Sequence, residues 1–67
     1  MTENQKMLAR YLKAVGCDAA SIVRIIEQTW EEDKTIAMLE FCRDNPDASP
    51  AELFAMSSTI ASQDEAM

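Results

Sequence analysis

Residues 30–45 constrain the fold of this chain most, because they are the longest run without glycine or proline that has both a start and a stop signal. At about 100° per residue, the apolar residues of this run share an arc of about half the helical circumference. They are Trp30, Met38, Leu39, Phe41 and Cys42. A helix packed on one neighbour needs a stripe of only about 100°. We therefore expect a helix that contacts at least two others.

Ile36 is the exception, since it projects from the polar face of this expected helix, between Glu32, Glu40 and Arg43. It either meets a further helix of the same chain or belongs to a contact with another chain. If a partner binds here, the residues that we expect to contact it are Ile36, Trp30, Glu40 and Arg43.

Two helices are expected before this run, at residues 3–15 and 19–28. The apolar arc of the first holds Met7, Leu8, Tyr11, Leu12, Ala14 and Val15. Gly16, the only glycine, stands where a residue of positive φ commonly closes a helix. Asp18 then supplies an N-cap. The apolar arc of the second holds Ala19, Ile22, Val23, Ile25 and Ile26.

The boundary between the second and third helices has no glycine or proline, so one continuous helix over residues 18–45 is an alternative. Thr29 and Glu32 have the spacing of a capping box, with threonine at the N-cap and glutamate at N3. That spacing favours a break at Thr29. Pro46 disfavours helical geometry in the residue before it and ends the third helix.

A fourth helix is expected at residues 50–62. Ser49 is its N-cap, Pro50 takes the first helical position, and Glu52 completes a capping box. Its apolar side holds Leu53, Phe54, Met56, Ile60 and Ala61. Its many serines and threonines lower its helix propensity, so we expect it to fray first and residues 63–67 to be disordered.

The predicted fold is all-α, a compact bundle of four short helices at about 3–15, 19–28, 30–45 and 50–62, in a single domain of residues 1–62. A chain of 67 residues buries only a small core, and such domains commonly add disulfides, metals or self-association. Cys17 and Cys42 are far apart in the sequence, and we expect both to be reduced and buried, with an intramolecular bridge as the alternative. We therefore expect self-association, as a homodimer, to add the stability that the small core does not supply.

The net charge of −6 argues against nucleic-acid binding, which needs a basic surface. The charges are unevenly spread, because Lys6, Arg10 and Lys13 lie near the start and most acidic residues follow later. This asymmetry suits pairing between two copies or with a basic partner. Two alternatives involve nucleic acid: the basic strip could contact it directly, or the acidic faces could copy the charge of DNA towards a nucleic-acid-binding protein.

The sequence predicts no enzyme, no cofactor and no metal site. It has no histidine, and one glycine cannot form a phosphate-binding loop. Neither cysteine has the neighbours of a nucleophile or the spacing of zinc ligands. The consecutive acids at 31–33 diverge around a helix, and the segment 44–47 lacks the glycine and distant glutamate of an EF-hand.

Several stretches together resemble small uncharacterised helical proteins encoded on bacterial mobile elements. They are Tyr11-Leu12-Lys13 with Gly16, Ile25-Ile26, Met38-Leu39-Glu40-Phe41 with Asn45-Pro46, and Ser49-Pro50-Ala51-Glu52. The resemblance implies a cytoplasmic bacterial accessory protein without an assigned activity, and it carries over no functional residue. The absence of a signal peptide or a long apolar run also predicts the cytoplasm. The expected function is a non-enzymatic protein-interaction module that self-associates, and the alternative is a small regulator acting on nucleic acid.

Overall fold

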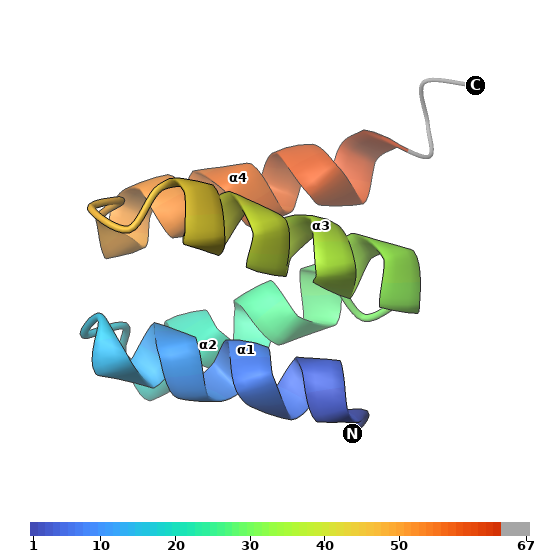
Figure 1. Ribbon diagram of the computed structural model, residues 1–67, viewed down its shortest axis with the longest axis horizontal. Helices are drawn as coiled ribbons and strands as arrows, with labels where there is room; N and C mark the ends of the chain where they lie inside the picture. Colours follow the sequence, from blue (N-terminus) through green and yellow to red (C-terminus); the bar gives the residue numbers. More distant parts are fainter. Residues whose placement is uncertain (64–67) are drawn as a thin grey trace.

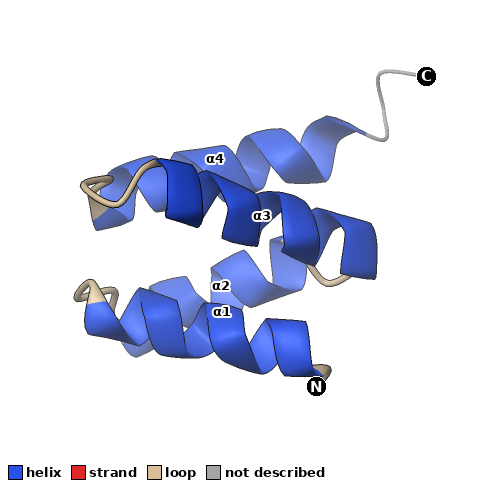
Figure 2. Ribbon diagram, in the orientation of Figure 1, coloured by secondary structure: helices blue, strands red, loops and turns tan. Residues whose placement is uncertain are grey.

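The computed structural model describes residues 1–63 and contains four α-helices in this part of the chain. They are α1 (Glu3–Ala14), α2 (Ala19–Gln28), α3 (Glu32–Asp44) and α4 (Pro50–Ser62). Short loops connect them, and no strand occurs among residues 1–63 (Figure 2). The predicted all-α bundle is confirmed.

The helices form two hairpins stacked in two layers, α1 with α2 and α3 with α4 (Figure 1). α1 packs against α2 and α3, and α4 packs against the same two helices. The predicted contact of the third helix with two others is therefore confirmed. The chain N-terminus and the α2–α3 connection lie at one end of the bundle, and the other two connections lie at the opposite end (Figure 1).

Local capping explains most helix ends. The side chain of Asp18 accepts a hydrogen bond from the backbone N–H of Ser21, which confirms the predicted N-cap of α2. Ser49 and Glu52 form the predicted capping box of α4. Gly16 has φ of +100°, as predicted for the residue that closes α1.

α1 begins with a capping box that the sequence analysis missed, formed by Thr2 and Gln5. The Thr2 hydroxyl accepts from the Gln5 N–H at 3.1 Å, and the Thr2 N–H donates to Gln5 Oε1 at 2.9 Å. Glutamine at N3 serves this motif as well as glutamate does. At the other end, Val15 is the C-cap of α1, one residue beyond its last helical residue.

The predicted start of the third helix at residue 30 is wrong, as is the N-cap role of Thr29. Thr29 ends α2, and its hydroxyl donates to the Ile25 carbonyl at 2.9 Å. The N-cap of α3 is Glu31, which has extended backbone and no side-chain capping bond. α3 also stops at Asp44 rather than residue 45. Because α2 and α3 are separated by these non-helical residues, the continuous-helix alternative is wrong too.

The core draws on all four helices and on the first connection. Its buried apolar residues are Leu8, Leu12, Cys17, Ile25, Ile26, Met38, Cys42, Leu53 and Ile60. Three large residues assigned to apolar arcs are exposed instead: Met7 is 49% exposed, Val23 55% and Trp30 54%. An apolar arc wider than the helix contact leaves its edge in water.

The C-terminal end of α4 departs from the prediction at one residue. Gln63, expected to be disordered, is the C-cap of α4 and has helical backbone angles. The rest of the predicted disordered segment, residues 64–67, lies outside the described residues. No helix within residues 1–63 has both the length and the apolar character needed to cross a membrane.

Candidate functional site

An apolar groove of about 320 Å³ lies between α1 and α2 and is the strongest candidate for a binding site. It is lined by Met1, Ala9, Ile22, Val23, Ile26, Glu27 and Trp30. Six of these seven side chains are apolar, which is the composition that ligand and peptide grooves share. Within α2 the lining runs from Ile22 to Glu27, which at 1.5 Å per residue is about 7.5 Å, and Met1 and Trp30 line the groove from beyond the helix ends.

Three apolar side chains at the edges of the groove are exposed to water. Met1 is 66% exposed, Val23 55% and Trp30 54%. Single exposed apolar residues are common, but a contiguous group around a concavity is typical of an interaction surface. Tryptophan in particular is enriched where partners bury an anchor residue. The groove therefore offers a partner apolar area that the monomer leaves uncovered.

Buried polar side chains fix the backbone that carries Trp30. Gln5 is 3% exposed, and its Nε2 donates to the Trp30 carbonyl at 2.7 Å. Thr35 is fully buried, and the single proton of its hydroxyl is shared between the carbonyls of Thr29 and Glu31. Buried polar groups are stable when they are hydrogen-bonded in this way. The connection between α2 and α3 is thus anchored from both α1 and α3, and Trp30 is held at the end of the groove.

The α1 side of the groove carries positive charge. Lys6 and Lys13 lie about 60° and 40° around α1 from the groove residue Ala9, at about 100° per residue. Both lysines and Arg10 are exposed, and none of the three forms an ion pair within residues 1–63. The only charged lining residue is Glu27, on the α2 side. The groove consequently combines an apolar floor with a basic edge.

The residues predicted to bind a partner lie on two surfaces. Trp30 belongs to the groove, whereas Ile36, Glu40 and Arg43 are exposed on the outer face of α3. Ile36 is 41% exposed, so the helices of residues 1–63 leave a large part of it open to water. Contact of this exposed part with another chain stays a prediction.

The sequence analysis missed the groove because it assigned Val23 and Ile26 to one continuous core face. One signal could have revealed it. The apolar positions of α2 spread over about 160° of the helix, from Ile25 to Val23, which exceeds the about 100° that one stripe needs. α2 packs mainly against α1 and α4, and the Val23 edge of that arc is left 55% exposed.

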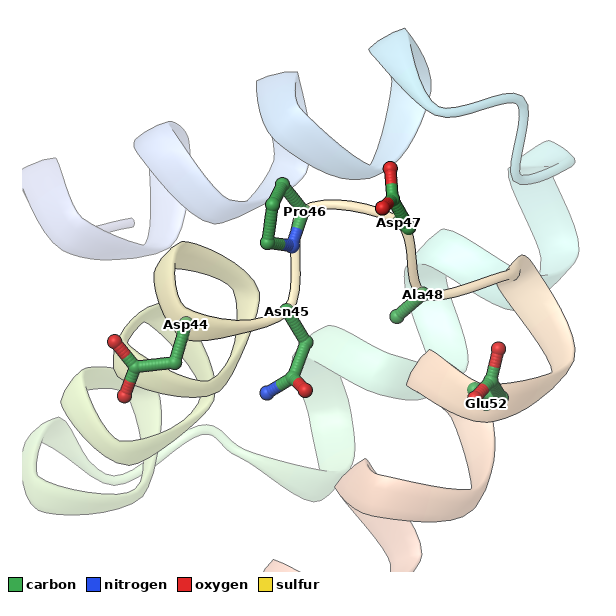
Figure 3. A pocket seen from close by; sticks show the side chains of 6 residues that line it. All are labelled: Asp44, Asn45, Pro46, Asp47, Ala48 and Glu52. Carbon is green, nitrogen blue, oxygen red and sulfur yellow. The ribbon is translucent and has the colours of Figure 1, made fainter.

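A second hollow, of about 290 Å³, lies at the connection between α3 and α4. It is lined by Asp44, Asn45, Pro46, Asp47, Ala48 and Glu52 (Figure 3). Figure 3 shows the three carboxylates pointing in different directions, and Glu52 is engaged with the Ser49 N–H at 2.9 Å. That bond lowers the pKa of the Glu52 carboxyl. No group of three or more cysteine, aspartate or glutamate side chains in residues 1–63 is arranged to hold a metal ion.

Cys17 and Cys42 are both buried and both free, as predicted. Burial raises the pKa of the Cys42 thiol to about 11, with a smaller contribution from Cys17. Burial also raises the pKa of Cys17, and Asp18 adds to this. A thiol reacts as the thiolate, so raised pKa values and burial make both cysteines poor nucleophiles at neutral pH.

The fold and the groove together define a small all-α bundle with an apolar surface groove and a basic edge. Comparison with protein-family models, with curated proteins and with solved structures finds no match to this chain. Any functional assignment therefore depends on the chemistry of its own surfaces.

Proposed function

We propose that this protein is a non-enzymatic protein-interaction module whose binding site is the groove between α1 and α2. The observation that carries the proposal is the exposure of Val23 and Trp30, each more than half accessible to water beside an apolar floor. Burying such side chains against a partner contributes about 25 cal/mol for each Å² of apolar surface removed from water.

A non-enzymatic role is supported by the side chains available for chemistry. The chain has no histidine, and its two thiols are buried with raised pKa values. The carboxylates around the α3–α4 hollow point apart (Figure 3). General acid–base catalysis needs a titratable group poised near the working pH and aimed at a substrate, and these groups do not supply it.

The dimensions of the groove favour a helical partner segment. The α2 side of the groove, about 7.5 Å long, corresponds to between one and two turns of an α-helix, which presents apolar anchors three and four residues apart. We also propose that a second copy of the chain is among the partners, because a core of this size gains stability from association. The two reduced, buried cysteines and the resemblance to proteins of bacterial mobile elements support a cytoplasmic setting.

A nucleic-acid role is the second candidate, and one observation favours it. Lys6, Arg10 and Lys13 line one side of α1 without ion-pair partners in residues 1–63. Against it stands the net charge of −6, because phosphate binding depends on a basic surface. Binding of this kind would weaken steeply with salt.

The test is an affinity pull-down from lysate of the source cell, with and without nuclease, read by mass spectrometry. The baits are the wild-type chain, Val23→Glu, and Ala55→Glu as the matched control. Ala55 is exposed on α4, in the other layer, so its variant adds the same charge away from the groove.

A protein captured by the wild-type and Ala55→Glu baits, but lost with Val23→Glu, supports the proposal. Equal capture by all three baits would remove the groove as the binding site. Recovery that disappears after nuclease treatment would favour the nucleic-acid role instead.

A further inference from the structure

We propose that the groove between α1 and α2 of one copy receives the Ile36 face of α3 from a second copy. The Ile36 face consists of Ile36 with its exposed neighbours Asp33, Glu40 and Arg43. This inference rests on the proposed function and names the partner and the two surfaces that meet.

The apolar parts of the two surfaces are complementary. Ile36 is 41% exposed and is the only large apolar residue exposed on α3. It stands among charged residues on a convex helical face, so it forms a single anchor. The groove offers a concave apolar floor of Ala9, Ile22 and Ile26, with Val23 and Trp30 at its edges. An isolated apolar anchor that enters such a floor is the arrangement of helix-in-groove recognition.

The charged parts of the two surfaces are also complementary. Asp33 and Glu40 lie three residues before and four residues after Ile36, on the same side of α3. The groove carries Lys6 and Lys13 along its α1 edge, without ion-pair partners within residues 1–63. Opposite charges at the edge of an interface increase the rate of association and set its orientation.

Glu27, the one acidic residue of the groove lining, has a basic counterpart in Arg43 of the Ile36 face, whose Nε lies 3.3 Å from Asp44 Oδ1 in the monomer. A symmetric contact between two grooves that lays α1 of one copy over α1 of the other would instead bring the two Lys6 and Lys13 edges together. Like charges across an interface oppose binding. The charges therefore favour groove against Ile36 face over this α1-on-α1 contact.

Such a contact is heterologous, because it joins two different surfaces of the same chain. The groove belongs to the α1/α2 layer, and Ile36 lies on α3 in the other layer (Figure 1). Heterologous contacts close into rings or continue as open chains, depending on the rotation between copies. In either case, one copy supplies only a groove and the next only an Ile36 face at each contact. Two variants that each lack one surface should then restore a single contact when mixed.

Sedimentation velocity tests this with four samples: the wild-type chain, Val23→Glu, Ile36→Glu, and an equimolar mixture of the two variants. Val23 and Ile36 are 55% and 41% exposed, so glutamate at either position reaches water in the monomer. Circular dichroism of each variant checks that the helices are retained. Ala55→Glu again serves as the control for added charge.

We expect the wild-type and Ala55→Glu chains to associate. Val23→Glu alone and Ile36→Glu alone should each remain at the monomer mass of 7.5 kDa. The mixture should form a heterodimer with at least about ten times the affinity of either variant for itself, and raising the salt concentration should weaken it several-fold.

Three results would overturn the inference. They are a wild-type chain that stays monomeric at all concentrations, association that survives Ile36→Glu, and a mixture that does not associate although both variants are folded. Failure here leaves the groove free to bind other proteins, whereas failure of the proposed function appears as equal capture by the Val23→Glu bait.

Discussion

Replacement of Gln5 by alanine tests whether one side chain both caps α1 and anchors the α2–α3 connection. Its Oε1 accepts from the Thr2 N–H at 2.9 Å, and its Nε2 donates to the Trp30 carbonyl at 2.7 Å. The variant keeps the Thr2 hydroxyl bond to the residue-5 N–H and loses only the reciprocal bond to the exposed Thr2 N–H, which costs about 0.5 kcal/mol. Loss of a hydrogen bond at a buried position costs about another 1–2 kcal/mol, because the remaining group is left unsatisfied.

We therefore expect Gln5→Ala to lower the free energy of unfolding by about 1.5–2.5 kcal/mol. This is a large share of the about 3–10 kcal/mol that a domain of this length possesses. Urea unfolding followed by circular dichroism measures it. Thr2→Ala is the matched control, because it removes the capping hydroxyl but leaves the bond to the Trp30 carbonyl, and it should cost only about 1 kcal/mol.

Hydrogen exchange at residues 29–31 gives a second measurement. Exchange there should accelerate in Gln5→Ala and stay close to wild type in Thr2→Ala, because only the first variant releases the connection. If both variants lose equal stability, the bond between Gln5 and Trp30 contributes nothing and our account of how Trp30 is positioned is wrong.

Three further perturbations test local features. Gly16→Val should lower the free energy of unfolding by about 1–2 kcal/mol, measured by urea unfolding. The φ of Gly16 is +100° and no atom lies within 4 Å of an added Cβ, so this cost is backbone strain alone. A negligible loss of stability would contradict this reason. Thr35→Val removes a fully buried hydroxyl whose one proton is shared between two carbonyls, and it should cost about 1–3 kcal/mol. An unchanged midpoint of thermal unfolding would show that those carbonyls find other donors. Because burial raises the pKa of Cys42 from its ordinary value of 9.0 to about 11, the unfolded chain loses this proton first and stability should fall as pH rises from 9 towards 11. The urea midpoint should fall less over this range in Cys42→Ala, and an equal fall would assign the effect to other groups.

The candidate site was only partly predictable. Trp30 was expected to bind a partner, and the structure places it at the end of an apolar groove. Its expected companions Ile36, Glu40 and Arg43 lie instead on the outer face of α3. The sequence analysis placed Trp30 on the apolar arc and Ile36 on the polar face of one helix that starts at residue 30. Since α3 starts at Glu32, Trp30 is not part of that helix.

The sequence by itself determined the number of helices and most of their ends, because caps and backbone preferences act over a few residues. Asp18, the Ser49–Glu52 capping box and the positive φ of Gly16 are of this kind. Tertiary structure decided the rest. Thr29 matches a capping motif, yet it is 1% exposed and ends α2, because a contact with Thr35 of α3 fixes its carbonyl. Likewise, only the packing partners of α2 decide which edge of its apolar arc is covered, and they leave Val23 in water beside the groove.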